Sequence, residues 1–233
     1  MSVIIAVYTP TGIVISGDSR TTKTVNEFVT NPQNPNQQIN IQKEIPFSDT
    51  TLKVFSLFGK FGVGISGTAF IDNLPIAHYI EQFEIENHAN SLLQTPNDLV
   101  TELISYFRQF EPIPNIVFTV AGYDKNVPFV FTVDISSNKR IRRNCNPEDE
   151  RCIWYGVTWD GDTNIINRLL SGTTIHYTMN LQDGIDFSRH LIRTTINQMK
   201  FEPVIPTVGG EIDTLVITTD KTEFISKKKL TCK

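Results

Sequence analysis

The sequence predicts an α+β fold: a four-layer α-β-β-α sandwich of two antiparallel sheets, formed by a single domain over residues 1–233. Two observations lead to this prediction. Short β-rich runs separated by turn residues occur in blocks, and stretches with helical periodicity come in pairs between those blocks. Hairpins grouped in this way, instead of a strict alternation of strand and helix, favour antiparallel sheets with helices packed on them.

The first block of strands begins at the third residue. Val3–Tyr8 and Ile13–Ser16 are β-rich runs separated by the turn sequence TPTG, which predicts a hairpin. A polar stretch broken by prolines, residues 31–38, predicts an exposed loop. Strand patterns resume in two further runs, Leu52–Leu57 and Phe61–Ile65.

The rest of the chain continues this order of helix pairs and strand blocks. Two helices are expected, Thr68–Ile85 and a second from just after Pro96 to Phe110. Four strands follow them: Ile116–Ala121, Phe129–Val133, Arg140–Arg143 and Ile153–Val157. The pattern ends with two more helices and a last hairpin: Thr163–Leu170, Ile185–Lys200, and Thr214–Thr218 with Thr222–Ile225.

Charge and hydropathy exclude two classes of partner. The chain has 21 Lys and Arg against 25 Asp and Glu, a net charge of -4, so it has no excess of positive charge to follow a phosphate backbone. No nucleic-acid partner is therefore expected. No apolar run approaches the roughly 20 residues that span a bilayer, and no basic segment precedes an apolar signal-peptide core. We expect no membrane contact and a cytoplasmic location.

The cysteines are an odd number, and none belongs to a CxxC pair: Cys145, Cys152 and Cys232. A chain of this length does not depend on disulfides for its core, and the missing CxxC pair argues against zinc or thioredoxin chemistry. We expect a reducing compartment, with a pairing of Cys145 and Cys152 across a hairpin tip as the alternative. No metal and no cofactor are expected.

A glycine motif suggests one class of ligand. Gly62–Gly67 matches GxGxxG, follows a predicted strand and precedes a predicted helix, as in dinucleotide-binding sites. Such a site also needs a parallel strand with an acidic residue about 20 positions further on. Here that region, near Glu84 and Glu86, is predicted to be helical, which disfavours a dinucleotide.

A serine motif suggests a second interpretation. Gly17-Asp18-Ser19 after an apolar strand is similar to the opening block of GDS(L)-type esterases, in which Ser19 would be the nucleophile. Those enzymes supply the base from an Asp-x-x-His pair. None of the four histidines has an Asp three residues before it, so the nucleophile would lack its usual base.

The start of the chain suggests a third interpretation. Met1 is followed by the small residue Ser2, and removal of Met1 would leave Ser2 with a free α-amino group. Such a group has a pKa of about 7.7 to 8.0 and is itself a base near neutral pH. An N-terminal Ser can therefore be activated by its own amine, as in N-terminal nucleophile hydrolases.

The chain resembles the β-type subunits of the proteasome, which belong to these N-terminal nucleophile hydrolases. Those subunits run from a nucleophile through a strand, a glycine turn and a second strand into Asp-Ser-Arg-x-Thr, as Gly12 and residues 18–22 do here. Counting back from Asp18 without a gap places the family's nucleophile on Ser2. Later segments that resemble the family are Leu52-Lys53-Val54-Phe55, Ser66-Gly67-Thr68-Ala69, Ala121-Gly122-Tyr123-Asp124, Val133-Asp134 and Gly209-Gly210.

The resemblance implies a role for each matched residue. Ser2 would be the nucleophile, with Lys53 and Asp18 as the activating pair, because a buried cation lowers the pKa of a nearby hydroxyl. The amide of Gly67, at the expected start of the first helix, would donate to the oxyanion. The remaining assignments are two supporting residues, Arg20 and Thr22, and two substrate-binding residues, Ile65 at the pocket floor and Thr21.

Two segments depart from the family pattern. Active subunits carry a supporting Ser in a Gly-Ser-Gly-Ser turn before the third helix, and a second Asp and Ser just ahead of the Gly-Gly pair. This chain has other residues at 155–162 and 206–208, where the candidates to substitute are Thr158, Asp160 and Thr207. The Met-Ser start and the sequence around Val208 and Ile212 are closer to the bacterial ancestral β-subunit branch.

These features predict a peptidase that hydrolyses peptide amide bonds, acts on peptides or unfolded proteins, and assembles into a homo-oligomeric ring. A catalytically inactive structural subunit and a small-molecule amidase of the same superfamily remain alternatives. Neither the ring size nor an ATPase partner follows from the sequence.

Overall fold

The computed structural model describes residues 2–88, 93–172 and 178–229, which contain sixteen strands and four helices. The fold is mixed α+β with antiparallel sheets, as predicted. The helices are α1 (Ile76–Asn87), α2 (Pro96–Phe107), α3 (Asn164–Leu170) and α4 (Leu181–Met199). None of the helices in the described part of the chain is long and apolar enough to cross a bilayer.

The first five-stranded sheet is built around the opening hairpin of the chain. Its strand order is β14-β1-β2-β15-β16, and all neighbours are antiparallel. The strands are β1 (Val3–Thr9), β2 (Gly12–Gly17), β14 (Gly156–Gly161), β15 (Asp213–Ile217) and β16 (Thr222–Ser226). Both strands of the opening hairpin are buried along their whole length, which explains their unbroken apolar sequence.

The second five-stranded sheet has the order β11-β10-β9-β6-β5 and is also antiparallel. Its strands are β5 (Val54–Leu57), β6 (Phe61–Gly67), β9 (Ile116–Asp124), β10 (Val127–Asp134) and β11 (Lys139–Arg142). Three two-stranded hairpins complete the described elements: β3 (Thr21–Asn31) with β4 (Asn34–Ser48), β7 (Phe70–Ile71) with β8 (Leu74–Pro75), and β12 (Cys145–Asn146) with β13 (Asp149–Ile153).

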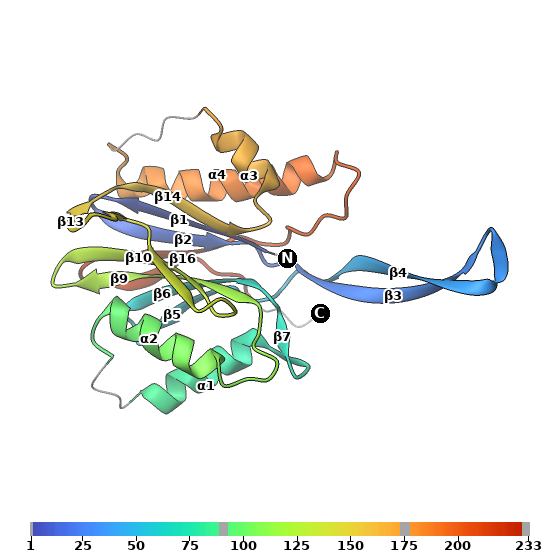
Figure 1. Cartoon of the computed structure of the whole chain (residues 1–233). Coiled ribbons are helices and arrows are strands. Elements are labelled where there is room, and N and C mark those ends of the chain that lie inside the picture. Colours follow the sequence, from blue (N-terminus) through green and yellow to red (C-terminus); the bar gives the residue numbers. More distant parts are fainter. Residues whose placement is uncertain (1, 89–92, 173–177, 230–233) are drawn as a thin grey trace.

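The two large sheets lie between two helix pairs (Figure 1). Helices α3 and α4 cover the first sheet through one apolar cluster, and α1 and α2 cover the second sheet through another. A third cluster joins side chains from both sheets, among them Ile15 and Leu215 from the first and Val54 and Val130 from the second. The two large sheets therefore share an apolar layer, and strands β1 and β2 lie at its centre.

The glycines of the GxGxxG motif have packing roles. Strand β6 is antiparallel to both of its neighbours, so the parallel strand required by a dinucleotide site is missing there. A Cβ on Gly64 would lie 2.5 Å from Ile4 Cγ2, and one on Gly62 would lie 2.6 Å from Ile217 Cδ1. These glycines therefore allow the close approach of the two sheets, and the dinucleotide interpretation is wrong.

The helices differ from the predicted ranges mainly at their starts. Helix α1 begins at Ile76 instead of Thr68, because the β7–β8 hairpin intervenes and turns at Asp72 and Asn73, both with positive φ. Helix α4 begins at Leu181, four residues earlier than predicted, where a capping box between Asn180 and Asp183 satisfies its first amides. Helix α2 ends at Phe107, three residues before the predicted end, and α3 begins one residue later than predicted.

The largest difference from the prediction is the β3–β4 hairpin, which we call the arm. Residues 31–38, predicted as an exposed loop, contain the tip of this hairpin, and its two strands extend over Thr21–Asn31 and Asn34–Ser48. The arm projects away from the body of the molecule (Figure 1). The predicted strand Ile153–Val157 is also wrong, because β13 ends at Ile153 and β14 begins at Gly156.

The alternative pairing of two cysteines is contradicted as well. Cys145 and Cys152 are both free thiols. In the β12–β13 register Cys145 lies opposite Ile153. Cys152 precedes Ile153 in the sequence, so the Cys152 side chain points to the other face of the strand. Cys232 lies outside the described residues.

Candidate active site

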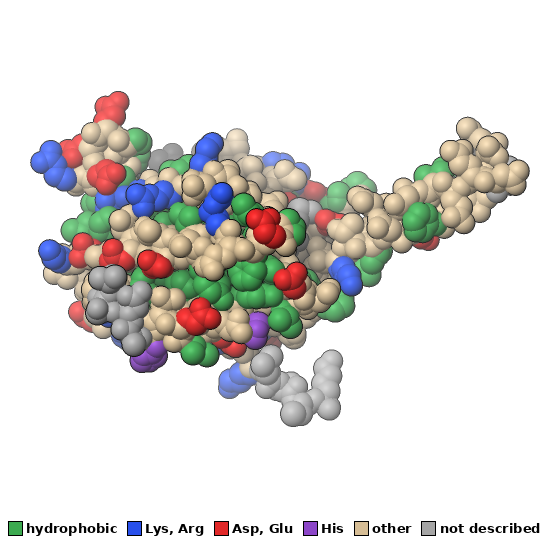
Figure 2. Space-filling model, turned by 60° about the horizontal axis from the view of Figure 1, so that its bottom comes forward, with side chains coloured by type: hydrophobic (Ala, Val, Ile, Leu, Met, Phe, Trp, Pro, Cys, Tyr) green, Lys and Arg blue, Asp and Glu red, His purple; other side chains and the backbone are tan. Residues whose placement is uncertain are grey.

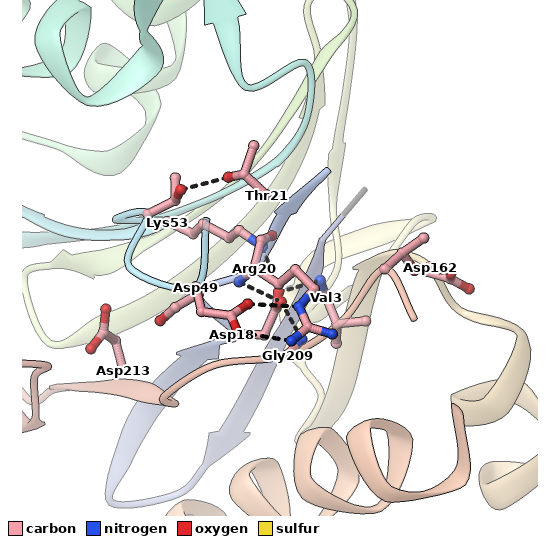
Figure 3. A network of polar contacts seen from close by, with 12 residues as sticks. Val3, Asp18, Arg20, Thr21, Asp49, Lys53, Asp162, Gly209 and Asp213 are labelled. Atoms are coloured by element: carbon pink, nitrogen blue, oxygen red, sulfur yellow. Dashed lines mark hydrogen bonds and ion pairs between the residues drawn. The ribbon is translucent and has the colours of Figure 1, made fainter. Parts of the chain in front are cut away.

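Asp18 is the centre of a buried polar network at the end of β2 (Figure 3). Its exposed fraction is 1 %, and its carboxylate accepts four hydrogen bonds. Oδ1 accepts from the Val3 amide (2.9 Å) and from Lys53 Nζ (2.8 Å). Oδ2 accepts from the amides of Arg20 (3.1 Å) and Gly209 (3.0 Å). One carboxylate therefore fixes the first strand, the lysine and the Gly209 segment relative to one another.

Lys53 lies immediately before β5 and is the cation of this network. Its ammonium donates to Asp18 Oδ1 and also to the backbone oxygen of Arg20. Burial lowers the pKa of the Lys53 ammonium, and the neighbouring Asp18 carboxylate opposes that shift. The lysine and the aspartate, predicted as one group, are thus in direct contact.

Ser2 is buried beside this pair. Its backbone oxygen accepts from the amide of Asp162 (2.7 Å), and the following amide, that of Val3, is bound by Asp18. Gly161 has φ +100°, and a Cβ at this position would lie 1.7 Å from the Ser2 oxygen. Strand β14 therefore needs glycine where it approaches the first residues of the chain.

Two cavities meet at Ser2. A small one of about 20 Å³ is lined by Ser2, Lys53, Ile65 and Gly67 together with neighbouring residues. A larger one of about 390 Å³ is lined by Ser2 and Gly67, by the base of the arm, and by Asn115. The residues predicted as nucleophile, activating lysine and oxyanion donor thus border a common space.

Gly67 is the last residue of β6 and does not begin a helix. Its φ is +100°, and a Cβ would lie 2.3 Å from the backbone oxygen of Asn115, so glycine is required. The next amide, that of Thr68, donates to the same oxygen (2.9 Å). Because α1 begins only at Ile76, the predicted assistance of a helix dipole at Gly67 is wrong. An oxyanion at this position would be stabilised by a hydrogen bond from the Gly67 amide, without a helix dipole.

The two predicted substrate-binding residues line the same cavities. Ile65 borders the small cavity, and its amide donates to the Lys53 oxygen (2.9 Å). Thr21 borders both cavities, and its hydroxyl donates to Thr51 Oγ1 (2.5 Å). Thr22 borders the larger cavity from β3, opposite Pro46 of β4. A substrate in this space would therefore contact the base of the arm.

The backbone amide and oxygen of Arg20 belong to the network around Asp18, while its side chain contacts other residues. The guanidinium forms a bidentate pair with Asp49 (Nε–Oδ1 2.6 Å, Nη2–Oδ2 2.8 Å) and donates to the Pro206 oxygen (3.2 Å). The hydrogen bond from Arg20 lowers the pKa of the Asp49 carboxyl. A Cβ on Gly209 would lie 2.5 Å from Arg20 Cζ, so this side chain packs against the backbone of the Gly-Gly segment.

The three candidates to replace the family's supporting residues lie in different places. Asp160 accepts from Thr119 (3.2 Å) on the second sheet, and burial raises the pKa of its carboxyl. Thr158 lies opposite Ala6 in the β1–β14 register. Thr207 alone is linked to Ser2, because its hydroxyl donates to the Asp162 carboxylate (2.6 Å), and the Asp162 amide binds the Ser2 oxygen.

Asp162 was not predicted from the sequence. It contacts Ser2 through its backbone amide, and a backbone contact leaves no signal in the residue type. The signal that could have found it is its position, since it ends the turn before α3, where the proteasome subunits that the sequence resembles carry their supporting Ser.

A second buried ion pair lies next to the first and was also missed. Lys228 donates to the Asp213 carboxylate, to Ser19 Oγ (2.7 Å) and to the Thr51 oxygen (3.0 Å). Ser19 is fully buried, and its hydroxyl donates to the backbone oxygen of Glu211 (2.6 Å). Ser19 is thus committed to a structural network, which disfavours its role as an esterase nucleophile.

No protein-family model matches this chain, and no curated protein matches it at a significant level of similarity. Within the described ranges, no group of three or more His, Cys, Asp or Glu side chains is arranged to hold a metal ion. What the site can do therefore follows from its own side chains. A buried lysine held by a carboxylate beside a serine is an arrangement that can activate a hydroxyl.

Proposed function

We propose that this chain is an N-terminal nucleophile hydrolase of the proteasome β-subunit type, which cleaves amide bonds in peptides or unfolded proteins. Ser2 is the nucleophile, and it becomes active when the Met1–Ser2 peptide bond is cleaved. The observation that carries the proposal is the buried Asp18–Lys53 pair, in which the same Asp18 oxygen binds the amide of Val3, next to Ser2.

The arrangement of the sheets and helices supports the same proposal. Two sheets that share an apolar layer, each covered by a helix pair, are compatible with the four-layer α-β-β-α sandwich of that superfamily in one domain. A fold alone does not define an activity, so the reaction is argued from the residues around Ser2.

In the proposed reaction the free amine of Ser2 takes the proton of the Ser2 hydroxyl as Oγ attacks the substrate carbonyl carbon. The tetrahedral oxyanion accepts a hydrogen bond from the Gly67 amide. The Ser2 ammonium then gives its proton to the leaving amine as the C–N bond breaks, which leaves an ester on Oγ. Water attacks this ester by the same sequence and releases the carboxylic acid with free Ser2.

Lys53 and Asp18 prepare the nucleophile in this scheme. The Lys53 ammonium lowers the pKa of the Ser2 hydroxyl by stabilising its charged form, and Asp18 holds the ammonium in position. Burial lowers the pKa of Lys53, and the hydrogen bonds that its ammonium donates to Asp18 and to the Arg20 oxygen favour the charged form that the reaction requires.

The larger cavity leaves room for a chain-like substrate next to Ser2. Its volume of about 390 Å³ lies within the range of small-molecule and peptide sites, and Ile65 borders the adjoining small cavity. Assembly into a homo-oligomeric ring and a cytoplasmic location belong to the same proposal.

One observation favours the alternatives. The cavity that joins Ser2 to Lys53 and Ile65 measures only about 20 Å³, which is too small for an amino-acid side chain. A small-molecule amidase or a structural subunit without catalysis would be compatible with that size. Profiling hydrolysis with peptides and with small acylated amines distinguishes the first alternative from a peptidase.

The test combines intact mass with covalent labelling. We expect the purified protein to lack Met1, to react once with a β-lactone at Ser2, and to hydrolyse peptide amides. Ser2→Ala should abolish labelling and hydrolysis, whereas Ser105→Ala, on the exposed side of α2, should leave both unchanged. Retention of Met1, or undiminished hydrolysis by Ser2→Ala, would show that the mechanism is wrong. A processed protein that neither labels nor hydrolyses would support the structural subunit.

A further inference from the structure

The arm has one apolar face that no other described part of the chain covers along most of its length. Residues directly opposite each other in an antiparallel pair point to the same face. The register pairs Lys23 with Ile45, Val25 with Lys43, Glu27 with Ile41 and Val29 with Ile39. The aliphatic side chains of this apolar face are Val25, Val29, Ile39, Ile41 and Ile45.

The opposite face of the arm is polar. It carries Thr24 with Glu44, Asn26 with Gln42, Phe28 with Asn40, and Thr30 with Gln38. Phe28 is its one large apolar side chain among these pairs. The arm therefore has the alternation of a sheet that buries one face and exposes the other to water.

The apolar face is nevertheless exposed in the isolated chain. The exposed fractions are 39 % for Ile39, 38 % for Ile41 and 42 % for Ile45. Figures 1 and 2 show the arm extending clear of the body, without another element of the chain along its outer part. A single two-stranded hairpin is marginally stable in water, and an amphipathic one needs a surface that covers its apolar face.

Two of the three charges on the apolar face compensate each other, and the third, Lys23, lies at the base of the arm. Lys43 and Glu27 form an ion pair with each other across the two strands, so each is already compensated within the arm. The body of the chain offers exposed apolar side chains next to the arm's base, around a cavity that Asp162 and Glu202 also line. Phe201, Val204 and Ile205 follow α4 and are exposed, and Val204 and Ile205 line a cavity of about 430 Å³ together with Lys43 of the arm.

We propose that the arm is the contact through which two copies of this chain associate, each laying its apolar face on the body of the other. Strand β3 has 11 residues, so one face of the arm measures about 35 by 10 Å, and covering it buries roughly 700 Å² on the two surfaces. A single arm is below the size of a stable interface. Reciprocal exchange of two identical arms buries roughly 1,400 Å², which is sufficient, and only a second copy supplies it.

This association goes beyond the proposed hydrolysis and does not require it. The experiment therefore measures mass and not activity, so an inactive but associated protein would refute only the proposed function. Analytical ultracentrifugation over a concentration series should give at least twice the mass of one chain for the wild type.

The decisive comparison uses the two faces of the same strand. Ile39→Thr/Ile41→Thr/Ile45→Thr alters the apolar face, and Gln38→Thr/Asn40→Thr/Gln42→Thr places the same residue at three exposed positions of the polar face. The first variant should weaken association at least about 100-fold, and the control should associate like the wild type. A monomeric wild type at tens of micromolar, or equal association of both variants, would overturn the proposal.

A second measurement does not depend on those variants folding. A photo-crosslinking residue at Ile41 in an equal mixture of light and heavy isotope-labelled protein should produce light–heavy crosslinks from the arm to the body. Crosslinks formed only within one chain would contradict arm exchange. If the arm binds a partner of a different kind, the variant of the apolar face should associate like the wild type, which also contradicts arm exchange.

Discussion

The ammonium of Lys53 lies 2.8 Å from Oδ1 of Asp18, and the two side chains are 6 % and 0 % exposed. A buried charge without a partner is costly, and in this pair each side chain supplies the other's countercharge. The pair connects β2 to the start of β5 and therefore joins the two large sheets at the candidate site.

Asp18→Asn should destabilise the protein strongly. The substitution leaves the Lys53 ammonium buried without its countercharge, and breaking a buried pair in this way costs about 3 to 5 kcal/mol of the free energy of unfolding. Asp49→Asn is the control, because the half-exposed Arg20–Asp49 pair should contribute less than about 1 kcal/mol. Urea unfolding of both variants measures the difference. Equal losses of unfolding free energy would show that burial does not determine how much an ion pair contributes.

Lys53→Met should remove activity if the proposed function holds. Methionine keeps a side chain of similar length but supplies no cation to lower the pKa of the Ser2 hydroxyl, so kcat/KM should fall by about 10² to 10⁴. Lys60→Met changes an exposed lysine in the turn before β6 and should leave kcat/KM unchanged. Peptide-hydrolysis assays on the processed enzymes decide between these results, and an active Lys53→Met enzyme would exclude the role of Lys53.

Gly161→Ala should be far more harmful than Gly172→Ala. Both glycines have positive φ, +100° and +81°, so both substitutions carry backbone strain of about 1 to 2 kcal/mol. At Gly161 the new Cβ would collide with the Ser2 oxygen, whereas no described residue, chain neighbours apart, lies within 4 Å of a Cβ at Gly172. Thermal unfolding should show the larger loss for Gly161→Ala, and equal losses would mean that the approach to Ser2 is relaxed in solution.

Asp160→Asn should stabilise the protein at neutral pH. Burial raises the pKa of the Asp160 carboxyl in the folded state, so the folded protein binds a proton more readily than the unfolded chain. Ionisation therefore reduces stability as the pH rises through the raised pKa, and asparagine removes this loss. The urea midpoint of Asp160→Asn should exceed that of the wild type at pH 7. This difference should disappear below pH 3.8, the ordinary pKa of the Asp160 carboxyl.

A matched control for this pH effect is Asp72→Asn. Asp72 is exposed in a turn with positive φ, a conformation that asparagine also tolerates. Its urea midpoint should differ little from that of the wild type at either pH. A stability gain for Asp160→Asn that persisted unchanged in acid would show that the gain does not come from the carboxyl's charge.

The parts of the fold that follow from the sequence are those buried on a regular period. The opening hairpin is apolar throughout because both its strands are covered, and its turn is marked by Pro10 and Gly12. The start of α1 was misplaced because residues 68–75 contain apolar side chains at helical spacing, which outweighed the hairpin-turn signal of Asp72 and Asn73.

The arm was missed for a different physical reason. Its apolar residues alternate with polar ones on an uncovered strand, and the proline-containing stretch near its tip matches loop composition. Lys53 and Asp18 were predicted as one group and are in contact, although their catalytic roles stay predictions. The Asp162 and Lys228 contacts could not be predicted, because one uses a backbone amide and the other joins segments about 200 residues apart in the sequence.

Lys228 also sets an order of events during synthesis. Its ammonium binds Ser19 Oγ and the Thr51 oxygen, which lie 209 and 177 residues earlier in the chain, so these two segments are made long before the residue that joins them. Until that residue leaves the ribosome, Asp213 is a carboxylate without its buried countercharge. A nascent chain shorter than 228 residues therefore lacks these contacts to Ser19 and Thr51, and the segments next to Asp18 and Lys53 can form them only after residue 228 has emerged.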